Sequence, residues 1–357
     1  MLKDTEGNLL TARVDALVNT VNTVGVMGKG IALQFKRAFP ANFRAYASAC
    51  RKHEVRLGEM FVFPLEQLEP PRYVINFPTK SDWRSKSRLK DIEAGLVDLR
   101  RVIGELDLKS LALPPLGCGN GGLNWSDVRP LIDEILGDLR EVEILVFVPS
   151  GAPSAEEMPV RTQKPRLSRF GAAVLVAYSR YIERSLEAGL SVEPKLALIE
   201  AHKVAYFLQE SGWPLRLRFT KGRYGPYSDA LNHYISSVEG HFISGYGDGT
   251  SGSEAALTLD AGAVQEAEEL LARDDEYQAT LRTLLDTLTG FEFPYGVELL
   301  STVHFAACRL TESGDSLPDV VQAINEWSPR KAALFKQHQA KTAYDKLTSA
   351  GLLPCSS

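Results

Sequence analysis

Cysteine is scarce in this sequence, and Cys50, Cys118, Cys308 and Cys355 form neither a CxxC pair nor a cluster with histidine. That spacing argues against a disulfide framework and favours the reduced thiols of a cytoplasmic protein. No group of His, Cys, Asp and Glu has metal-ligand spacing, so we predict no metal and no cofactor. No apolar run reaches the roughly 18–20 residues that span a bilayer, so a membrane is not an expected partner.

An excess of positive charge is also missing. The formal net charge is −5, which argues against a surface that coats nucleic acid broadly. Residues 1–150 are nearly neutral, and residues 151–357 carry all of the net negative charge. No repeat with a period of 20–50 residues is visible, so a repeat array is not expected. A length of 357 residues therefore predicts two domains.

Residues 1–150 alternate between segments with strand and with helix patterns. This alternation predicts an α/β domain in which helices cover both faces of a sheet, a three-layer α/β/α fold. Ligands of such folds bind beyond the carboxyl ends of the strands. The expected strands are Val14–Val18, Met60–Pro64, Tyr73–Phe77, Ser110–Pro114 and Glu143–Val148, and the expected helices are Ile31–Phe39, Ala41–Lys52, Leu89–Leu106 and Ser126–Leu139.

The composition changes after residue 150. Residues 151–166 are rich in proline, serine and charge, without apolar periodicity, and are predicted to be a linker. Residues 167–357 show mainly helical patterns, which predict a second, mostly α-helical domain. Its expected helices are Phe170–Leu186, Pro194–Ser211, Asp229–Ile235, Ala261–Ala272, Tyr277–Thr289, Leu299–Ala307, Pro318–Glu326 and Lys331–Ala350.

Two glycine-rich loops carry the functional signal. In the first, the strand Val14–Val18 leads to Asn19 and Asn22, and a loop with three glycines precedes a helix at Ile31. Backbone N–H groups at such a helix N-terminus suit an anion, and the asparagine side chains suit sugar hydroxyls. The segment therefore predicts a site for a nucleotide-sugar phosphate.

The second loop, PPLGCGNGGLNW, spans Pro114–Trp125 between a strand and a helix. Its glycines permit positive φ and close approach of the backbone to a phosphate. The GxGxxG spacing loosely fits a dinucleotide fingerprint, but a Rossmann fold places that loop after its first strand. A Walker A loop is excluded because Thr23 and Gly30 occupy the positions of its required Gly and Ser/Thr.

Together, MGKGIALQFKRAFP (Met27–Pro40) and LPPLGCGNGGLNW (Leu113–Trp125) resemble the macrodomain superfamily over roughly residues 1–150. Within it they are similar to the ADP-ribosyl glycohydrolases that include terminal ADP-ribose glycohydrolase and the DarG antitoxins. The resemblance implies a mixed sheet, ADP-ribose as ligand or product, and catalytic roles for Lys80 of NFPTK and for Asn22 at the distal ribose. The ADP-ribose contacts that it implies are Asn8, Leu9, Thr20, Gly28, Lys29, Gly30, Ile31, Ala32, Leu33, Thr79, Leu116, Gly117, Cys118, Gly119, Asn120, Gly121 and Gly122.

Two positions depart from the family patterns. Terminal ADP-ribose glycohydrolase has an acidic residue where this chain has Gly121, whereas the DarG antitoxins lack it. This difference favours removal of ADP-ribose from thymidine in single-stranded DNA; the alternatives are a hydrolase of protein-linked ADP-ribose and a non-catalytic ADP-ribose-binding module. Many macrodomains place an aspartate where it accepts from the adenine amine, and here Asn8 can still accept through its side-chain carbonyl.

The sequence leaves the role of Lys80 open between a nucleophile and a proton-donating or electrostatic group. A nearby pyrophosphate raises the pKa of a lysine, whereas burial lowers it. Trp83 is a candidate for stacking on a base beside the reacting centre. Four cations close to Lys80 are candidate contacts for DNA phosphates: Arg84, Lys86, Arg88 and Lys90.

The second domain shows no catalytic pattern. Its YFLQ helix, Tyr224–Tyr227 (YGPY) and Trp327–Lys331 resemble the Panacea-type antitoxin domain, although an unrelated helical bundle is the alternative. The resemblance implies that this domain binds and neutralises a DarT-type toxin. The segment Glu254–Glu298 holds 11 acidic residues against two arginines, and an acidic surface complements the cationic cleft of a DNA-binding toxin.

Overall fold

The computed structural model describes residues 1–311 and 316–353. Contacts divide these residues into two units. The first unit comprises Met1–Gln163 together with Gly247–Thr250, and the second comprises Lys164–Tyr246 together with the residues from Ser251 onward. No helix among the described residues combines the length and apolar character that crossing a membrane requires.

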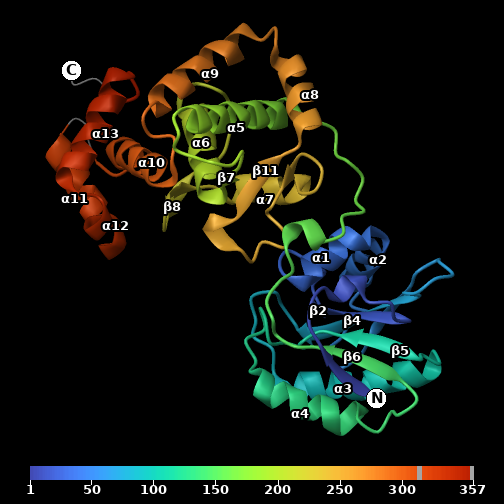
Figure 1. Cartoon of the computed structure of the whole chain (residues 1–357). Coiled ribbons are helices and arrows are strands. Elements are labelled where there is room, and N and C mark those ends of the chain that lie inside the picture. Colours follow the sequence, from blue (N-terminus) through green and yellow to red (C-terminus); the bar gives the residue numbers. More distant parts are fainter. Residues whose placement is uncertain (312–315, 354–357) are drawn as a thin grey trace. The chain divides into compact units, whose positions relative to one another are not determined.

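The first unit is a three-layer α/β/α domain with a mixed sheet, as predicted (Figure 1). The strand order is β1-β6-β5-β2-β4-β3, and only β3 runs antiparallel to its neighbour. The strands are β1 (Leu2–Thr5), β2 (Ala16–Asn22), β3 (Phe61–Pro64), β4 (Tyr73–Lys80), β5 (Ser110–Leu113) and β6 (Glu143–Phe147). The helices are η1 (Leu9–Thr11), α1 (Ile31–Ala38), α2 (Pro40–Arg51), α3 (Leu89–Glu105), α4 (Trp125–Leu136) and η2 (Ala155–Glu157).

Figure 1 shows α1 and α2 on one face of this sheet and α3 and α4 on the other. Alternate residues of β2 supply the two cores: Val18 packs in the core with α3 and α4, and Leu17 packs in the core with Phe35 of α1. Because both faces are covered, nearly all of β2 is buried. The sheet thus holds the carboxyl ends of β2 and β4 in fixed positions.

Two expectations for this unit need correction. The edge strand β1 was not predicted, because LKDT is short and has one apolar residue. Most of the predicted linker also packs on the first unit: the N–H of Arg161 donates to the carbonyl of Arg37 at 2.9 Å, and its guanidinium lies over the ring of Phe39. Buried Met158 shows that this segment contributes apolar packing, which its proline-rich composition hides.

The second unit is mainly helical, as predicted (Figure 1). Its helices are α5 (Arg169–Glu187), α6 (Leu198–Glu210), α7 (Asp229–Val238), η3 (Gly252–Glu254), α8 (Ala261–Leu271), α9 (Asp275–Leu288), α10 (Pro294–Arg309), α11 (Leu317–Trp327), α12 (Pro329–Leu334) and α13 (Gln337–Ser349). Short strands that were not predicted form a sheet of order β10-β11-β7 and a β8–β9 hairpin. They are β7 (Leu196–Ala197), β8 (Thr220–Gly222), β9 (Gly225–Tyr227), β10 (Ile243–Ser244) and β11 (Ala256–Leu259).

The single helix predicted for Lys331–Ala350 is wrong, because the chain breaks between α12 and α13. Phe335 adopts an extended conformation there and is buried, with its ring 5.5 Å from that of Tyr295. Packing of this aromatic side chain therefore overrides the local preference for continuous helix.

Candidate functional site

Lys80 and Asn22 end two neighbouring parallel strands. β4 ends at Lys80 and β2 ends at Asn22, and the two residues are paired across the strands after a register shift at Val21. Both therefore lie at the carboxyl edge of the sheet, where α/β folds bind their ligands. The structure brings together the two residues that the sequence analysis assigned to catalysis.

The amine of Lys80 is held by two backbone carbonyls. Its Nζ donates to the carbonyl of Asn120 at 3.0 Å and to that of Trp83 at 3.2 Å. Burial lowers the pKa of Lys80 below its ordinary value, and the carboxylate of Asp82 opposes this shift. The sequence analysis did not consider Asp82, although its place two residues after Lys80 was a visible signal. Partial burial favours the amine form and also makes the ammonium a stronger acid.

The side chain of Asn22 forms hydrogen bonds with the backbone of the first glycine loop. Its Oδ1 accepts from the N–H groups of Val24 at 3.0 Å and Val26 at 3.2 Å, and its Nδ2 donates to the carbonyl of Val26 at 2.6 Å. The Tyr46 hydroxyl also donates to Oδ1 at 3.2 Å. Within the described residues the second N–H of this amide has no partner, so one donor remains for a ribose hydroxyl. The ribose contact itself stays a prediction.

Three further asparagines form a buried network beneath this edge. Asn19 donates to Asn76 Oδ1 at 3.0 Å, and Asn76 donates to Asn42 Oδ1 at 2.7 Å. The network ties β2 and β4 to α2, so Asn19 supports the strands that carry Lys80 and Asn22. The sequence analysis missed Asn42 and any role for the side chain of Asn76, because neither lies in a glycine loop.

The first loop ends at an uncapped helix N-terminus. Gly30 is the N-cap of α1, has a φ of 64°, and provides no side chain to cap the helix. Its carbonyl already accepts the N–H groups of Leu33 and Gln34, which leaves those of Ile31 and Ala32 for an anion. A Cβ at Gly30 would lie 3.0 Å from Asn120 Nδ2, so the two glycine loops approach each other here.

The second loop connects β5 to α4 and folds back on itself. The N–H of Leu123 donates to the carbonyl of Gly117, and that of Gly122 donates to the carbonyl of Gly119, both at 3.1 Å. Gly117 and Gly122 have φ values of 70° and 76°, which favour glycine. Gly119, Asn120 and Gly122 are exposed, whereas Leu116, Gly117 and Gly121 are buried and Cys118 is half-buried.

The other predicted ADP-ribose contacts lie in the first glycine loop, on β2 and β4, and near the N-terminus. Gly28 and Lys29 are exposed in the first loop, Thr20 lies half-buried on β2, and the Thr79 hydroxyl donates to the carbonyl of Val21 at 3.4 Å. Leu9 is a core residue. Asn8 caps η1 through Oδ1 and donates from Nδ2 to the carbonyl of Glu157. Both ends of its amide are therefore engaged, and the predicted adenine contact would use the second lone pair of Oδ1.

Comparisons with known proteins identify the family of the chain. A Macro domain model matches residues 18–132. A DNA ADP-ribosyl glycohydrolase of Thermus aquaticus is 45% identical over 99% of this chain and 94% of its own length. That of Mycobacterium tuberculosis is 41% identical over 96% of this chain and 97% of its own length. The chain belongs to the DNA ADP-ribosyl glycohydrolase family.

Solved macrodomains resemble part of this glycohydrolase. The macrodomain of Mycobacterium tuberculosis DarG is 53% identical and covers 42% of this chain and 99% of its own, with a TM-score of 0.42. The macrodomain of Thermus aquaticus DarG is 56% identical with the same coverage of both chains and a TM-score of 0.41. The described residues contain no group of three or more His, Cys, Asp or Glu side chains that could hold a metal ion.

The glycohydrolase has no room for an acidic residue at Gly121. A Cβ at this position would clash with Ser87 Oγ and with the carbonyl of Gly117. The N–H of Ser87 also donates to the carbonyl of Gly121 at 3.0 Å, so the segment after Lys80 packs closely on the second loop. The departure predicted to distinguish this chain from terminal ADP-ribose glycohydrolase is thus required by the packing of the loop.

An exposed aromatic side chain stands beside Lys80. Trp83 is 50% exposed although it is a large apolar residue, and its own carbonyl holds the Lys80 amine. The guanidinium of Arg84 lies 4.4 Å from the centre of the indole ring. Of the nearby cations that the sequence analysis proposed for DNA, Arg88 is bonded to Asp91 on α3, which leaves Arg84, Lys86 and Lys90 as the stronger candidates.

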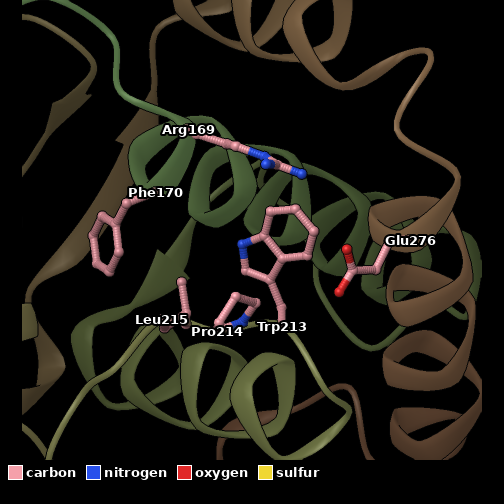
Figure 2. Close-up of a pocket in the computed structure, with 6 residues that line it drawn as sticks. All are labelled: Arg169, Phe170, Trp213, Pro214, Leu215 and Glu276. Atoms are coloured by element: carbon pink, nitrogen blue, oxygen red, sulfur yellow. The ribbon is translucent and has the colours of Figure 1, made fainter.

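The second unit contains a separate pocket, which does not suit ADP-ribose (Figure 2). Arg169 lies over the indole of Trp213 and is paired with Asp274, so both its face and its charge are already engaged. Glu276 adds a negative charge to the lining, which repels a phosphate. The residues that line the pocket are Arg169, Phe170, Trp213, Pro214, Leu215 and Glu276.

Proposed function

We propose that this glycohydrolase removes ADP-ribose from thymidine bases of single-stranded DNA. The observation that carries the proposal is the pairing of Lys80 and Asn22 at the carboxyl ends of β4 and β2. The curated relatives that match nearly the whole chain are named DNA ADP-ribosyl glycohydrolases, which supports DNA as the carrier of the modification. The proposed specificity for thymidine rests on the resemblance to the DarG antitoxins.

Hydrolysis breaks the bond between the anomeric carbon of the distal ribose and a ring nitrogen of the base. The transition state resembles an oxocarbenium ion, so the site must position the sugar and assist the departing base. The uncapped N–H groups of Ile31 and Ala32 and the exposed backbone of the second loop suit the pyrophosphate. The remaining N–H of Asn22 suits a hydroxyl of the distal ribose, beside Lys80.

Lys80 can serve this reaction by either of two routes. As an amine, Nζ attacks the anomeric carbon, and the base leaves with the bonding electrons and takes the proton that Nζ loses. The ribose ring then opens to a Schiff base with Nζ, which water hydrolyses to release ADP-ribose and the free amine. As an ammonium, Nζ donates a proton to a carbonyl oxygen of the leaving base while water attacks. Borohydride distinguishes the routes, because a ring-opened Schiff base on Lys80 is reduced to a stable adduct that mass spectrometry detects. Both routes require Lys80.

The substrate test compares two carriers of ADP-ribose. We expect the protein to release ADP-ribose from a modified thymidine oligonucleotide and not from a protein with glutamate-linked ADP-ribose. The packing at Gly121 supports this preference, because it removes the carboxylate that assists the lysine in terminal ADP-ribose glycohydrolase. Release from the protein substrate alone, or binding of both substrates without release, would contradict the proposal.

We also propose that the second unit binds and neutralises a DarT-type toxin. A Thermosipho africanus relative, 36% identical over 40% of this chain and 41% of its own length, is named a DNA ADP-ribosyl transferase–DNA ADP-ribosyl glycohydrolase fusion protein. Within Glu254–Glu298, Glu292 and Glu298 are buried and four acids are paired with Lys164, Arg180, Arg169 and Arg184. The acidic surface is therefore smaller than the composition suggests. The acids that are exposed and in no ion pair among the described residues are Glu254, Asp260, Glu269, Asp275 and Glu276.

A charge-reversal variant of the full chain tests this second role. Glu269→Lys/Asp275→Lys/Glu276→Lys should lose toxin inhibition at equal concentration, because like charges then oppose the cationic cleft. The matched control, Glu187→Lys/Asp319→Lys/Glu326→Lys, changes three exposed acids elsewhere in the second unit and should retain inhibition. Lys80→Ala should also retain it. Equal inhibition by both triple variants would contradict the role of this surface.

A further inference from the structure

The segment Ser211–Ser228 of the second unit, SGWPLRLRFTKGRYGPYS, contains four cations and no carboxylate. Arg216, Arg218, Lys221 and Arg223 are all exposed. None of the four takes part in an ion pair within residues 1–311 and 316–353. This is unexpected, because residues 151–357 carry the net negative charge of the chain.

Most other arginines of the second unit have an acidic partner. Arg180 is paired with Glu183 and Glu268, Arg309 with Glu210, and Arg330 with Glu298. Four neighbouring cations without such partners repel one another, and an anion that binds to them relieves this repulsion. The arrangement therefore indicates a ligand with several negative charges.

Buried side chains and hydrogen bonds hold the segment that carries these cations in place. Trp213, Leu215 and Leu217 are buried and alternate with exposed Pro214, Arg216 and Arg218. Arg216 has a positive φ of 55°, so the backbone turns locally between the buried side chains of this segment. The following hairpin of β8 and β9 (Figure 1) is fixed by the Trp327 indole, which donates to the carbonyl of Gly222 at 2.9 Å, and by buried Lys203, which donates to the carbonyl of Pro226 at 2.6 Å.

Aromatic rings are interleaved with the cations. The Lys221 ammonium lies 5.4 Å from the ring centre of Trp327. Two guanidinium groups lie near the ring centre of half-buried Tyr224, that of Arg223 at 5.4 Å and that of Arg330 at 4.7 Å. A cationic surface with aromatic rings is typical of proteins that bind single-stranded nucleic acids without reading their sequence.

We propose that Arg216, Arg218, Lys221 and Arg223 bind the phosphates of single-stranded DNA. The ligand is unmodified DNA, so this site acts separately from the ADP-ribose site and does not depend on the proposed hydrolysis. A second point of attachment to the same strand raises the effective concentration of a modified base for the first unit. The second unit would then contribute to substrate binding as well as to toxin binding.

The test measures binding of a fluorescent oligothymidylate of about 20 nucleotides, longer than a typical single binding site, to the full chain at several salt concentrations. We expect Arg216→Gln/Arg218→Gln/Lys221→Gln/Arg223→Gln to weaken binding at least about tenfold at low salt. The slope of log Kd against log salt should fall by about 3, because each phosphate contact contributes about 0.7 on single strands. Arg216→Lys/Arg218→Lys, which keeps the charge, should retain the slope.

The matched control is Arg166→Gln/Arg273→Gln/Arg282→Gln/Lys336→Gln. It removes the same charge from exposed cations of the second unit that are in no ion pair among the described residues, and we expect it to leave the slope unchanged. Equal effects of the two quadruple variants would overturn the proposal, as would normal DNA binding by the first variant combined with lost toxin binding. Circular dichroism verifies folding, and hydrolysis of ADP-ribosylated thymidine nucleoside, which has no phosphodiester, should be equal in all variants.

Discussion

Each unit contains lysines whose pKa is lowered by burial, and two of them, Lys80 and Lys331, have different surroundings. Lys80 lies at the carboxyl edge of a sheet, is bonded to two backbone carbonyls, and is partly exposed. Lys331 is fully buried on α12, where its Nζ donates to Glu298 Oε1 at 2.6 Å and to Thr302 Oγ1 at 2.9 Å. Burial lowers the pKa of Lys331 to about 8, although Glu298 opposes the shift. A shifted lysine is a candidate for chemistry only where a substrate can reach it.

The two lysines should differ most strongly in how much each contributes to the stability of the protein. Lys331→Met should lower the free energy of unfolding of the second unit by about 3 kcal/mol, because it leaves Glu298 buried with Arg330 as its only cationic partner among the described residues. Lys80→Met removes only bonds to carbonyls at the edge of a sheet and should change stability much less. Chemical denaturation followed by tryptophan fluorescence measures both, with exposed Lys336→Met as control. Equal destabilisation by Lys80→Met and Lys331→Met would contradict this expected difference in stability.

The loop that bonds Lys80 should tolerate no side chain at Gly121. Gly121→Ala places a methyl group against Ser87 Oγ and the Gly117 carbonyl, so the loop must shift and the affinity for ADP-ribose should fall by about tenfold or more. Gly104→Ala on α3 is the control, because it lies outside the predicted site and a Cβ there meets no heavy atom within 4 Å. Calorimetric titration with ADP-ribose measures both. An unchanged affinity of Gly121→Ala would show that this packing does not shape the site.

Access of the substrate to Lys80 should involve Trp83. If a base stacks on this half-exposed indole, Trp83→Ala should raise KM for a modified oligonucleotide about tenfold, since stacking of one base contributes about 1–3 kcal/mol. The change should be smaller for a modified nucleoside without neighbouring bases. Steady-state kinetics on the two substrates measures the difference, and Leu68→Ala, which changes a fully exposed apolar side chain of the first unit, is a control. An equal rise in KM for both substrates would assign Trp83 to another contact.

Mild acid should lower the stability of the second unit more than that of the first. Burial lowers the pKa of His304 from 6.5 to about 4, and the Leu352 carbonyl opposes the shift. The folded state therefore binds fewer protons than the unfolded state between these values, so this stability is fully present above pH 6.5 and is lost as the pH falls towards 4. Hydrogen exchange should show protection decreasing in α10 and α6 before the sheet of the first unit, whose His53 is exposed. Loss of protection in the sheet first would contradict this order.

More of the structure of the first unit than of the second could be predicted from the sequence. The resemblance to the glycohydrolases implied Lys80 and Asn22. The predicted α/β sheet then explains why the carboxyl ends of their strands lie at one edge. The bracing of the loop by Asn22 and the clash at Gly121 depend on backbone conformation after the strands end. No pattern in the sequence reports these contacts, so only the structure shows them.

The second unit was less accessible to prediction, because its main features arise from packing between distant segments. β7 and β10 have two residues each, too few for a period of two to be visible. The break at Phe335 and the burial of Lys331 and Lys203 contradict local preferences, since a lysine in a helix pattern ordinarily indicates a solvated face. The cations of Ser211–Ser228 were visible in the sequence, but their lack of acidic partners was not.

We propose above all that Lys80 carries out the release of ADP-ribose from DNA. The most direct measurement is a single-turnover assay on a thymidine oligonucleotide with one ADP-ribose, using wild type and Lys80→Ala at equal concentrations of folded protein. We expect wild type to return the unmodified oligonucleotide and free ADP-ribose, and Lys80→Ala to bind the substrate with a release rate at least about a thousandfold lower. Release by Lys80→Ala at the wild-type rate would contradict the account.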